Sequence, residues 1–443
     1  MTDTPPAPSP VKSAATPSVP IRWRIFSFLF GFGFLAYVQQ KSITVAAARM
    51  MPELSLTQLQ IGYLEQAFVL GYALFQMPGG IFGQRLGARR TFVIISLTAF
   101  LATIATPIAP EFLHGHALFA ALFGAQLLLG CSQGAIFPVS AGVFEAWFPP
   151  NRWSFVQGLQ TMGLGLGAAL TPPLIANLMN ESGWQRALVW AALPALGLIA
   201  LWAWYGRNTP REHPAVCAQE LAEIGDQPPA HASISLKQML KLLRNRNVLL
   251  LFISYMSMNY TFYLLSNWVF LYLVQERHFS VLESGWLATA PPLAAALGAG
   301  VGGLATGALT QRFGTLWGYR IVPLIALPAA GVLLLIALNA SNAYWAVATL
   351  AMCFGSVELT EGAFWGAAMT VGRGDTMAIC GFMNTGGNLG GIISIPIVAY
   401  FSGQHAWPTA FVIGVAFAIV SAAAWLGIRI APPPEATQPP SGR

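Results

Sequence analysis

The sequence is poor in charged residues. Of its 443 residues only 9% are Asp, Glu, Lys or Arg, whereas 55% are hydrophobic. A soluble globular protein carries about 25% charged residues, so this chain has too few charged residues to form a water-exposed surface. A membrane-spanning helix needs about 20 mostly apolar residues, and the chain has enough of them for about a dozen spans. The composition therefore excludes a soluble enzyme, a nucleic-acid binder and a disordered scaffold, and indicates an integral membrane protein.

Cysteines and clustered metal ligands are scarce as well. The four cysteines are scattered, and no pair has the spacing of a redox or zinc motif. His114 and His116 stand close together, but only Glu111 accompanies them, so an adventitious surface pair is the simpler interpretation. No Ser/His/Asp set or phosphate-binding loop stands out. We therefore expect no metal, no cofactor and no enzymatic activity.

Long apolar segments make up most of the chain, in two groups of six. They lie at about 25–48, 58–80, 91–109, 117–147, 154–179 and 187–206, and then at 248–275, 283–309, 319–338, 343–371, 377–401 and 407–429. Each has the length of a membrane-spanning helix. The pattern predicts an all-α integral membrane protein with twelve transmembrane helices in two pseudo-symmetric six-helix bundles.

Polar segments divide the chain into domains. Residues 1–21 are rich in Pro, Ala, Ser and Thr and are expected to form a disordered tail. The bundles are expected at 22–206 and 248–430, with a linker at 207–247 that contains a short surface helix near 234–244, and a tail at 431–443. The first apolar stretch is too long for a signal peptide and lacks a small-residue cleavage site, so it is expected to remain as a span.

The positive charges are distributed unevenly. With both termini placed inside the cell, 18 of the 22 Lys and Arg fall in cytoplasmic segments, and only Arg49, Arg186 and Arg277 fall outside. Cytoplasmic loops accumulate Lys and Arg, so the net charge of +6 reports the topology of the chain rather than its ligand. We expect a multi-pass protein of the cytoplasmic (inner) membrane with both termini cytoplasmic.

The two halves repeat each other. Five residues of the first half recur 223 positions later: Gly158, Gly163, Gly167, Pro173 and Trp184 match Gly381, Gly386, Gly390, Pro396 and Trp407. A loop motif at 83–87 (GQRLG) has a counterpart at 310–314 (TQRFG), 227 positions on. Duplicated six-helix halves suggest a transporter whose halves rock about a site near the middle of the membrane.

These motifs resemble the major facilitator superfamily, and within it the anion:cation symporter branch. The resembling segments are 79–90 (GGIFGQRLGARR), Gly130, Gly134 and Pro138 in the fourth span, 147–149 (WFP), 183–184 (GW), 208–214 (NTPREHP) and 381–391 (GFMNTGGNLGG). The match extends from about 25 to 430. It implies the twelve-helix fold, alternating access and a small-molecule substrate.

The departures from this resemblance concern charge. The loop signature usually has Asp where this chain has Gln84, and the first span usually reads Tyr-x-Asp-Arg where this chain has 37–40 (YVQQ). The fourth span usually offers Arg and Glu at the positions of Gln126 and Gln133. In proton-coupled members those groups bind the carboxylate and carry the proton, so their mechanism cannot be transferred unchanged.

The resemblance makes the loops with the Gln-Arg-x-Gly pattern candidates for gating, because in the family such loops latch the two halves together. Glycines permit tight turns, and arginines can cap the carbonyl ends of neighbouring helices. The alternative is that the arginines only orient the chain in the membrane. The gating candidates are Gly80, Gln84, Arg85, Gly87, Arg89 and Arg90 in the first loop and Gln311, Arg312 and Gly314 in the second.

Lys41 is the only Lys or Arg that lies deep in a predicted span. A cation near the bilayer centre costs at least about 3 kcal/mol, so it must be paired or solvated. One interpretation is that its side chain reaches toward the membrane interface. The other is that it anchors an anion and replaces the arginine missing at Gln40.

Three acidic residues also lie inside spans and are the candidate proton-coupling groups: Glu361, Glu358 and Glu65. Glu358 and Glu361 stand three residues apart and share a helix face with Trp365. Two such carboxyls do not both ionise easily, which makes the pair a candidate proton carrier, with Glu361 favoured because it is closer to Trp365. A structural role, through bonds to backbone, Gln or Lys41, is the alternative. Glu145, at a span end, is expected at the interface.

Amides and aromatic residues in the spans complete the candidate site. A single intramembrane amide mostly joins helices, but amides on five helices together suggest a polar lining between the halves. The candidate substrate-binding residues are Tyr37, Gln39, Gln40, Lys41, Gln126, Gln133, Gln160, Tyr260, Tyr263, Asn267, Trp268, Trp365, Asn384 and Asn388.

The sequence thus predicts a monomeric secondary transporter that moves a small polar organic anion, of the carboxylate or sugar-acid type, by alternating access. Proton coupling is one possibility. An uncoupled uniporter or exchanger is the alternative because the usual proton-carrying groups are absent, and a transport-incompetent sensor on the same fold is another. A drug exporter is disfavoured by the amide-rich lining.

Overall fold

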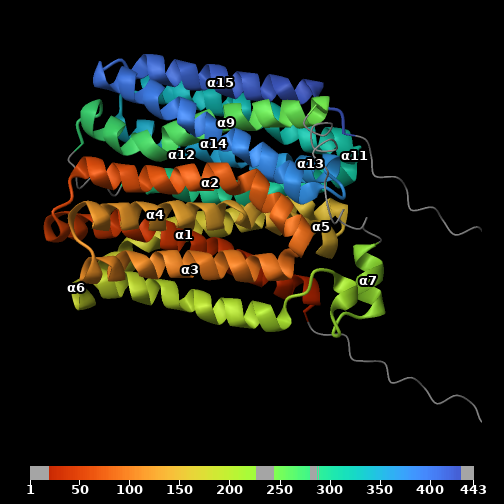
Figure 1. Ribbon diagram of the computed structural model, residues 1–443. Coiled ribbons are helices and arrows are strands. Elements are labelled where there is room, and N and C mark those ends of the chain that lie inside the picture. The colour runs from red at the N-terminus through yellow and green to blue at the C-terminus, as the bar shows by residue number, and fades with distance from the viewer. Residues whose placement is uncertain (1–18, 226–243, 280–286, 288, 431–443) are drawn as a thin grey trace, which may run out of the picture.

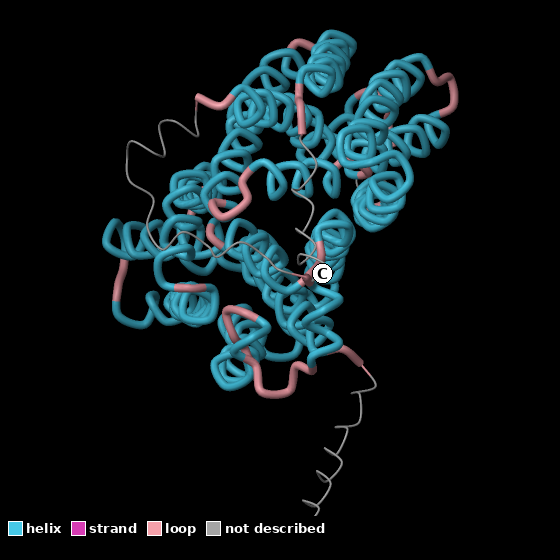
Figure 2. Tube along the Cα trace, turned by 90° about the vertical axis from the view of Figure 1, so that its right-hand side faces the viewer, coloured by secondary structure: helices cyan, strands magenta, loops and turns pink. Residues whose placement is uncertain are grey.

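The computed structural model describes residues 19–225, 244–279, 287 and 289–430, and throughout these ranges the regular structure is helical (Figures 1 and 2). The first half contains α1 (Ile21–Leu54), α2 (Gln58–Leu86), α3 (Ala88–Phe112), α4 (Gly115–Gly134), α5 (Ile136–Trp147) and α6 (Trp153–Tyr205). The second half contains α9 (Arg246–Gln275), α11 (Ala290–Asn339), α12 (Ala343–Glu358), α13 (Glu361–Val371), α14 (Thr376–Gly403) and α15 (Trp407–Gly427). The two halves form two adjacent bundles (Figure 1).

Twelve membrane passes can be traced in the described residues. Eight segments are long and apolar enough to cross a membrane by length and composition, with α4 and α5 counted together and α12 and α13 counted together. Two of the eight, α6 and α11, are long enough for two passes each and are broken by a glycine. The helices α2 and α14 fall outside the apolarity criterion because they carry many polar and glycine residues. Adding these two helices gives the predicted twelve passes.

Glycines at positive φ turn the chain between passes. Gly183 in α6 and Gly314 in α11 have φ values of 81° and 75°, so each of these helices is in fact two passes joined by a sharp turn. Gly87, with φ 81°, separates α2 from α3 in the same way. A side chain is strained at such φ values, which explains why glycine occupies these three turns.

The fourth and tenth passes are each broken midway, which corrects the prediction of single continuous helices at 117–147 and 343–371. The break between α4 and α5 lies at Ala135, three residues before Pro138, whose ring removes a backbone donor. The break between α12 and α13 is a tight turn in which the amide of Thr360 donates to the carbonyl of Val357 at 3.1 Å. The first break lies at 135 and the second at 359–360, 224 to 225 positions later and close to the offset of 223, so the breaks are part of the repeat.

Packing of the repeated glycines shows the same duplication. A Cβ at Gly163 would lie 2.6 Å from the ring of Phe30, and a Cβ at Gly386 would lie 2.9 Å from the ring of Phe252, which is 222 positions after Phe30. The fifth pass therefore packs on α1 as the eleventh, α14, packs on α9. The internal repeat in the sequence therefore corresponds to equivalent helix contacts in the two halves.

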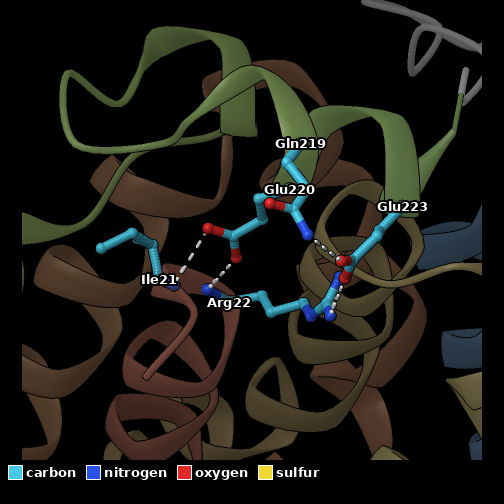
Figure 3. A network of polar contacts seen from close by, with 5 residues as sticks. All are labelled: Ile21, Arg22, Gln219, Glu220 and Glu223. Carbon is cyan, nitrogen blue, oxygen red and sulfur yellow. Dashed lines mark hydrogen bonds and ion pairs between the residues drawn. The ribbon is translucent and has the colours of Figure 1, made fainter. Parts of the chain in front are cut away.

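A short helix, α7 (Ala218–Ile224), lies against the start of α1. The carboxylate of Glu220 accepts hydrogen bonds from the backbone amides of Ile21 and Arg22 at 3.1 and 2.9 Å, and Glu223 pairs with the Arg22 guanidinium (Figure 3). An acidic side chain at a helix start satisfies free amides and suits the helix dipole. We call the end of the molecule where α7 lies the linker end (Figure 1). The helix predicted near 234–244 lies almost wholly outside the described residues.

Candidate transport site

Polar side chains from both halves meet at mid-depth between the bundles. Tyr37 of α1 and Tyr72 of α2 interact electrostatically with Tyr263 of α9 and with Glu361 of α13. We call the following seven residues the central polar cluster: Tyr37, Tyr72, Tyr255, Tyr263, Glu358, Glu361 and Asn384. Because its members come from α1, α2, α9, α12, α13 and α14, a movement of one half against the other changes the cluster.

Glu361 is held firmly within this cluster. It is the first residue of α13, directly after the break in the tenth pass. Its carboxylate accepts hydrogen bonds from the indole Nε1 of Trp365 at 2.7 Å and from the hydroxyl of Tyr255 at 3.0 and 3.3 Å. The ring of Trp365 in turn lies 5.5 Å from that of Phe137 in α5 of the first half. The carboxylate is thus fixed at the contact between the halves.

Glu358 lies across the break from Glu361, as the last residue of α12. It is only 4% exposed, and within the described ranges it forms no hydrogen bond or ion pair. Two buried carboxyls therefore lie close together, one with two donors and one with none.

Lys41 and Glu65 lie apart from that pair. Lys41 is one helical turn beyond Tyr37 in α1, away from the linker end, and Glu65 lies two turns before Tyr72 in α2. Glu65 is the charged group that acts on Lys41, but the two side chains are not within 4.0 Å of each other. Glu65 is exposed and Lys41 half-buried, and both lie between the central polar cluster and the end of the molecule opposite the linker end.

Several predicted amides join helices. Gln133 donates to the carbonyl of Ala36 at 3.0 Å and to the side chain of Gln39 at 3.4 Å, which ties α4 to α1. Gln160 donates to Ser140 at 2.7 Å. These contacts give Gln39, Gln133 and Gln160 a role in holding the first half together, which was the simpler alternative for each amide.

Two other predicted amides, Asn384 and Asn388, lie at the cluster. The hydroxyl of Tyr263 donates to the side-chain oxygen of Asn388 at 3.2 Å, and Asn388 donates to the backbone of Asn384 at 3.0 Å. Gln126 is 3% exposed, in α4. Gln40 is half-buried beside Lys41. The set from α9 and α14 is thus brought together as expected.

Tyr260, one of the predicted residues of α9, faces away from the cluster. The ring of Tyr260 stacks on Phe417 of α15, with centroids 4.1 Å apart, so it faces its own half and we remove it from the proposed lining. Asn267 is exposed near the end of α9, and Trp268 is half-buried beside it.

The sequence interpretation missed Tyr72 and Tyr255, which contribute hydroxyls to the cluster. It also missed Gln76 of α2, which is fully buried one turn from Tyr72. Gln157 of the fifth pass is fully buried with both ends of its amide unpaired. A spacing signal existed for Tyr255 and Asn259, which lie one turn apart and pack against Gly387. No signal in the sequence distinguished Tyr72 from other intramembrane aromatics.

The halves are joined at the linker end by hydrogen bonds that we call the latch, formed by Gln84, Glu145, Gly374 and Asp375. The amide of Gln84 donates to the carbonyl of Gly374 at 3.0 Å and to the carboxylate of Asp375 at 2.9 Å. Glu145 accepts from the backbone amide of Gly374 at 3.1 Å. Glu145 is therefore buried between the halves, which corrects its prediction as an interfacial residue.

Close backbone approaches accompany the latch. A Cβ at Gly80 would lie 2.2 Å from the carbonyl oxygen of Met377, and one at Gly381 would lie 2.7 Å from that of Gln76. In the fifth pass, a Cβ at Gly158 would lie 2.4 Å from the carbonyl oxygen of Ala299. All these contacts cross between the halves in the parts of the helices nearer the linker end, so this end is closed.

The remaining gating candidates have different surroundings in the two halves of the chain. Arg89 donates to the carbonyl of Ala203 near the end of α6, while Gly87 makes the turn before it. Arg85 and Arg90 are exposed. In the second half Gln311 and Arg312 are exposed and make no described hydrogen bond to the first half, and Gly314 only forms the turn. Of the two loops with this pattern, only the first therefore contributes a residue, Gln84, to the latch.

Replacing Gln84 should weaken the latch. The two hydrogen bonds stabilise the closed linker end by only about 1 kcal/mol net, because the amide oxygen of Gln84 is buried without a partner and its lost hydration offsets part of the gain. Gln84→Ala should thus raise the population open at the linker end roughly fivefold, measured as the distance between spin labels at Leu86 and Phe313. Gln84→Asp should increase the population open at the linker end further, since a second carboxylate would face that of Asp375. Gln311→Ala is the matched control, and an effect equal to that of Gln84→Ala would contradict the assignment.

Comparison with known proteins identifies this architecture. The family model described as Major Facilitator Superfamily matches residues 29–376, which is more than half of the chain. The chain belongs to the major facilitator superfamily. It is a multi-pass membrane transporter, not an enzyme, and the resemblance drawn from the loop and glycine motifs is confirmed.

Relatives within the superfamily include named anion transporters. The chain is 28% identical over 374 residues to a probable sulfoacetate transporter of Cupriavidus necator, covering 83% of this chain and 84% of the relative. It is 24% identical to the hexuronate transporter of Bacillus subtilis, covering 86% and 88%. It is 25% identical to a probable galactarate/D-glucarate transporter of Escherichia coli K12, covering 88% and 90%.

Solved structures share the fold. The major facilitator transporter FucP in its outward conformation superposes with a TM-score of 0.70 at 15% identity, covering 93% of this chain and all of that one. The proton:xylose symporter XylE superposes with a TM-score of 0.70 at 12% identity, covering 92% and 96%. The twelve-helix architecture predicted from the sequence is therefore confirmed.

Proposed function

We propose that this transporter moves a small organic anion, a carboxylate or sugar acid, into the cell by alternating access and with proton coupling. The observation that carries the proposal is Lys41, a lysine inside a span with no hydrogen bond or ion pair in the described structure. An unpaired cation at this depth is costly, and an anionic substrate would pair with it. Relatives that are named as transporters of sulfoacetate, hexuronate and galactarate/D-glucarate support the same class of substrate.

The orientation follows from charge. The linker end carries most of the Lys and Arg, and such residues accumulate on the cytoplasmic side. We propose that the linker end and both termini are cytoplasmic and that the membrane is the inner one. The latch then closes the cytoplasmic side, so the conformation described here faces outward.

The coupling site is the Glu358–Glu361 pair. It lies deeper than Lys41, at the contact between the halves, where the exposure of a carboxyl changes as the halves rock. Glu65 acts instead beside Lys41, so we assign it to the substrate approach and not to coupling. The protein functions as a monomer, because each half completes the site with the other.

The test is a thermal-shift screen of the purified protein against carboxylates, sugar acids, sulfonates, neutral sugars and organic cations, followed by uptake into proteoliposomes. We expect stabilisation only by anions and accumulation that requires an inward proton gradient. Stabilisation by neutral or cationic compounds alone would contradict the substrate class. Anion uptake that equilibrates but never accumulates would instead favour a uniporter.

A further inference from the structure

The two glutamates at the break in the tenth pass have different surroundings. Glu361 accepts from Trp365 and Tyr255, and an indole N–H can only donate. Hydrogen bonds of this kind stabilise the charged form of a carboxyl group. Of the two glutamates, Glu361 is therefore the better suited to remain a carboxylate.

Glu358 receives no such support. Only 4% of its surface is exposed, and it accepts no hydrogen bond in the described structure. A buried carboxylate without a partner costs several kcal/mol, and the charge of Glu361 on the next turn adds repulsion. Glu358 therefore avoids this cost by holding a proton.

Among the residues that the structure describes, no cation forms an ion pair with either glutamate. Tyr37, Tyr72 and Tyr255 are the titratable groups that act on it from α1, α2 and α9. The first pass of α11 has no Asp, Glu or Lys and no Arg before Arg312, and α14 has none of the four. Lys41 interacts with Glu65 instead. The deep part of the site thus carries one negative charge when Glu358 is protonated and two when it is not.

We propose that Glu358, not Glu361, is the group that carries the transported proton, and that Glu361 is a fixed carboxylate that positions and retains that proton. This inference rests on the proposed function and deepens it. An anion entering the cluster meets two negative charges unless Glu358 is protonated, so proton and substrate bind together. The proton comes from water on the open side, forms the O–H bond of the Glu358 carboxyl, and leaves to water on the other side once the substrate has gone.

The first test needs no substrate. Infrared spectroscopy of the purified transporter at neutral pH should show the carbonyl stretch of a protonated, buried carboxyl group. Glu358→Gln should remove this band, whereas Glu361→Gln should retain it because the proton stays on Glu358. A band that survives in Glu358→Gln and disappears in Glu361→Gln would assign the proton to Glu361 and overturn the inference.

The second test uses an anion found in the screen. In the wild type, the Kd should rise up to tenfold per pH unit above the titration of Glu358, as expected for one linked proton. Glu358→Gln should bind with a Kd independent of pH, lose accumulation, and retain exchange of labelled for unlabelled anion. Glu361→Gln should keep a pH-dependent Kd.

The outcomes separate the two proposals. A Glu358→Gln variant that still accumulates anion overturns the assignment of the proton but leaves the proposed function intact. A wild-type Kd that is independent of pH rejects proton coupling itself. If Glu358→Gln does not fold, the infrared band and pH slope of Glu361→Gln still decide, since their loss assigns the proton to Glu361.

Discussion

Replacing Lys41 with glutamine should raise the Kd of the transported anion at least tenfold. Lys41 has no partner among the described side chains, so its charge is available to a substrate carboxylate. A hydrogen bond to a charged group contributes about 1.5–3 kcal/mol, and each 1.4 kcal/mol changes the Kd tenfold. Isothermal titration of the purified variant measures the change directly.

Two matched variants make this result specific. Lys41→Arg keeps the charge and should bind within a few-fold of the wild type. Glu65→Gln removes the carboxylate that acts on Lys41 and should leave the anion bound as tightly or more tightly. An unchanged Kd in Lys41→Gln would show that Lys41 reaches the membrane interface instead and does not bind the substrate.

The fold was predictable because its main determinants are local. Twelve apolar segments, the excess of Arg in the short loops and the repeat at 223 positions can each be counted in the sequence. The helix breaks at Ala135 and at 359–360 were not predicted. Pro138 gave a signal for the first, whereas the second depends on a tight turn that places Glu361 at a helix start.

The site was predictable in part. Glu361 and Trp365 lie one turn apart in α13, so helical periodicity alone predicted their contact, whereas Glu358 ends α12 on the other side of the helix break. Tyr255 and Tyr72 join them from α9 and α2, and contacts over such separations depend on how the helices pack. Tyr260 shows the opposite error, since composition suggested a lining residue but the rotation of α9 turns it onto Phe417.

One helix connects the latch to the cluster. α14 begins beside the latch, brings Met377 against Gly80 and Gly381 against Gln76, and then contributes Asn384 and Asn388 at mid-depth. Opening of the linker end must separate the first of these contacts, and because a helix moves as a rigid element it shifts the asparagines at the same time. Substrate contacts and gating are therefore linked through α14.

Gly80→Ala should abolish most accumulation by shifting this equilibrium toward opening at the linker end. The added Cβ would lie 2.2 Å from the carbonyl oxygen of Met377 in the other half, but 3.3 Å from Pro138 in its own half. The clash is thus severe only while the linker end is closed. Overpacking costs about 1–3 kcal/mol, which corresponds to a shift of about 5- to 150-fold. The distance between labels at Leu86 and Phe313 should lengthen, and proton-driven uptake should fall at least fivefold.

Gly124→Ala provides the control, because a Cβ at Gly124 would meet nothing within 4 Å. Its label distance and uptake should match the wild type. The first half accepts the Gly80→Ala side chain in isolation, so the variant should remain folded and should bind the anion from the linker side. A variant that stays closed at the linker end and accumulates normally would show that Met377 can yield locally, and the contact between Gly80 and Met377 would then have no part in gating.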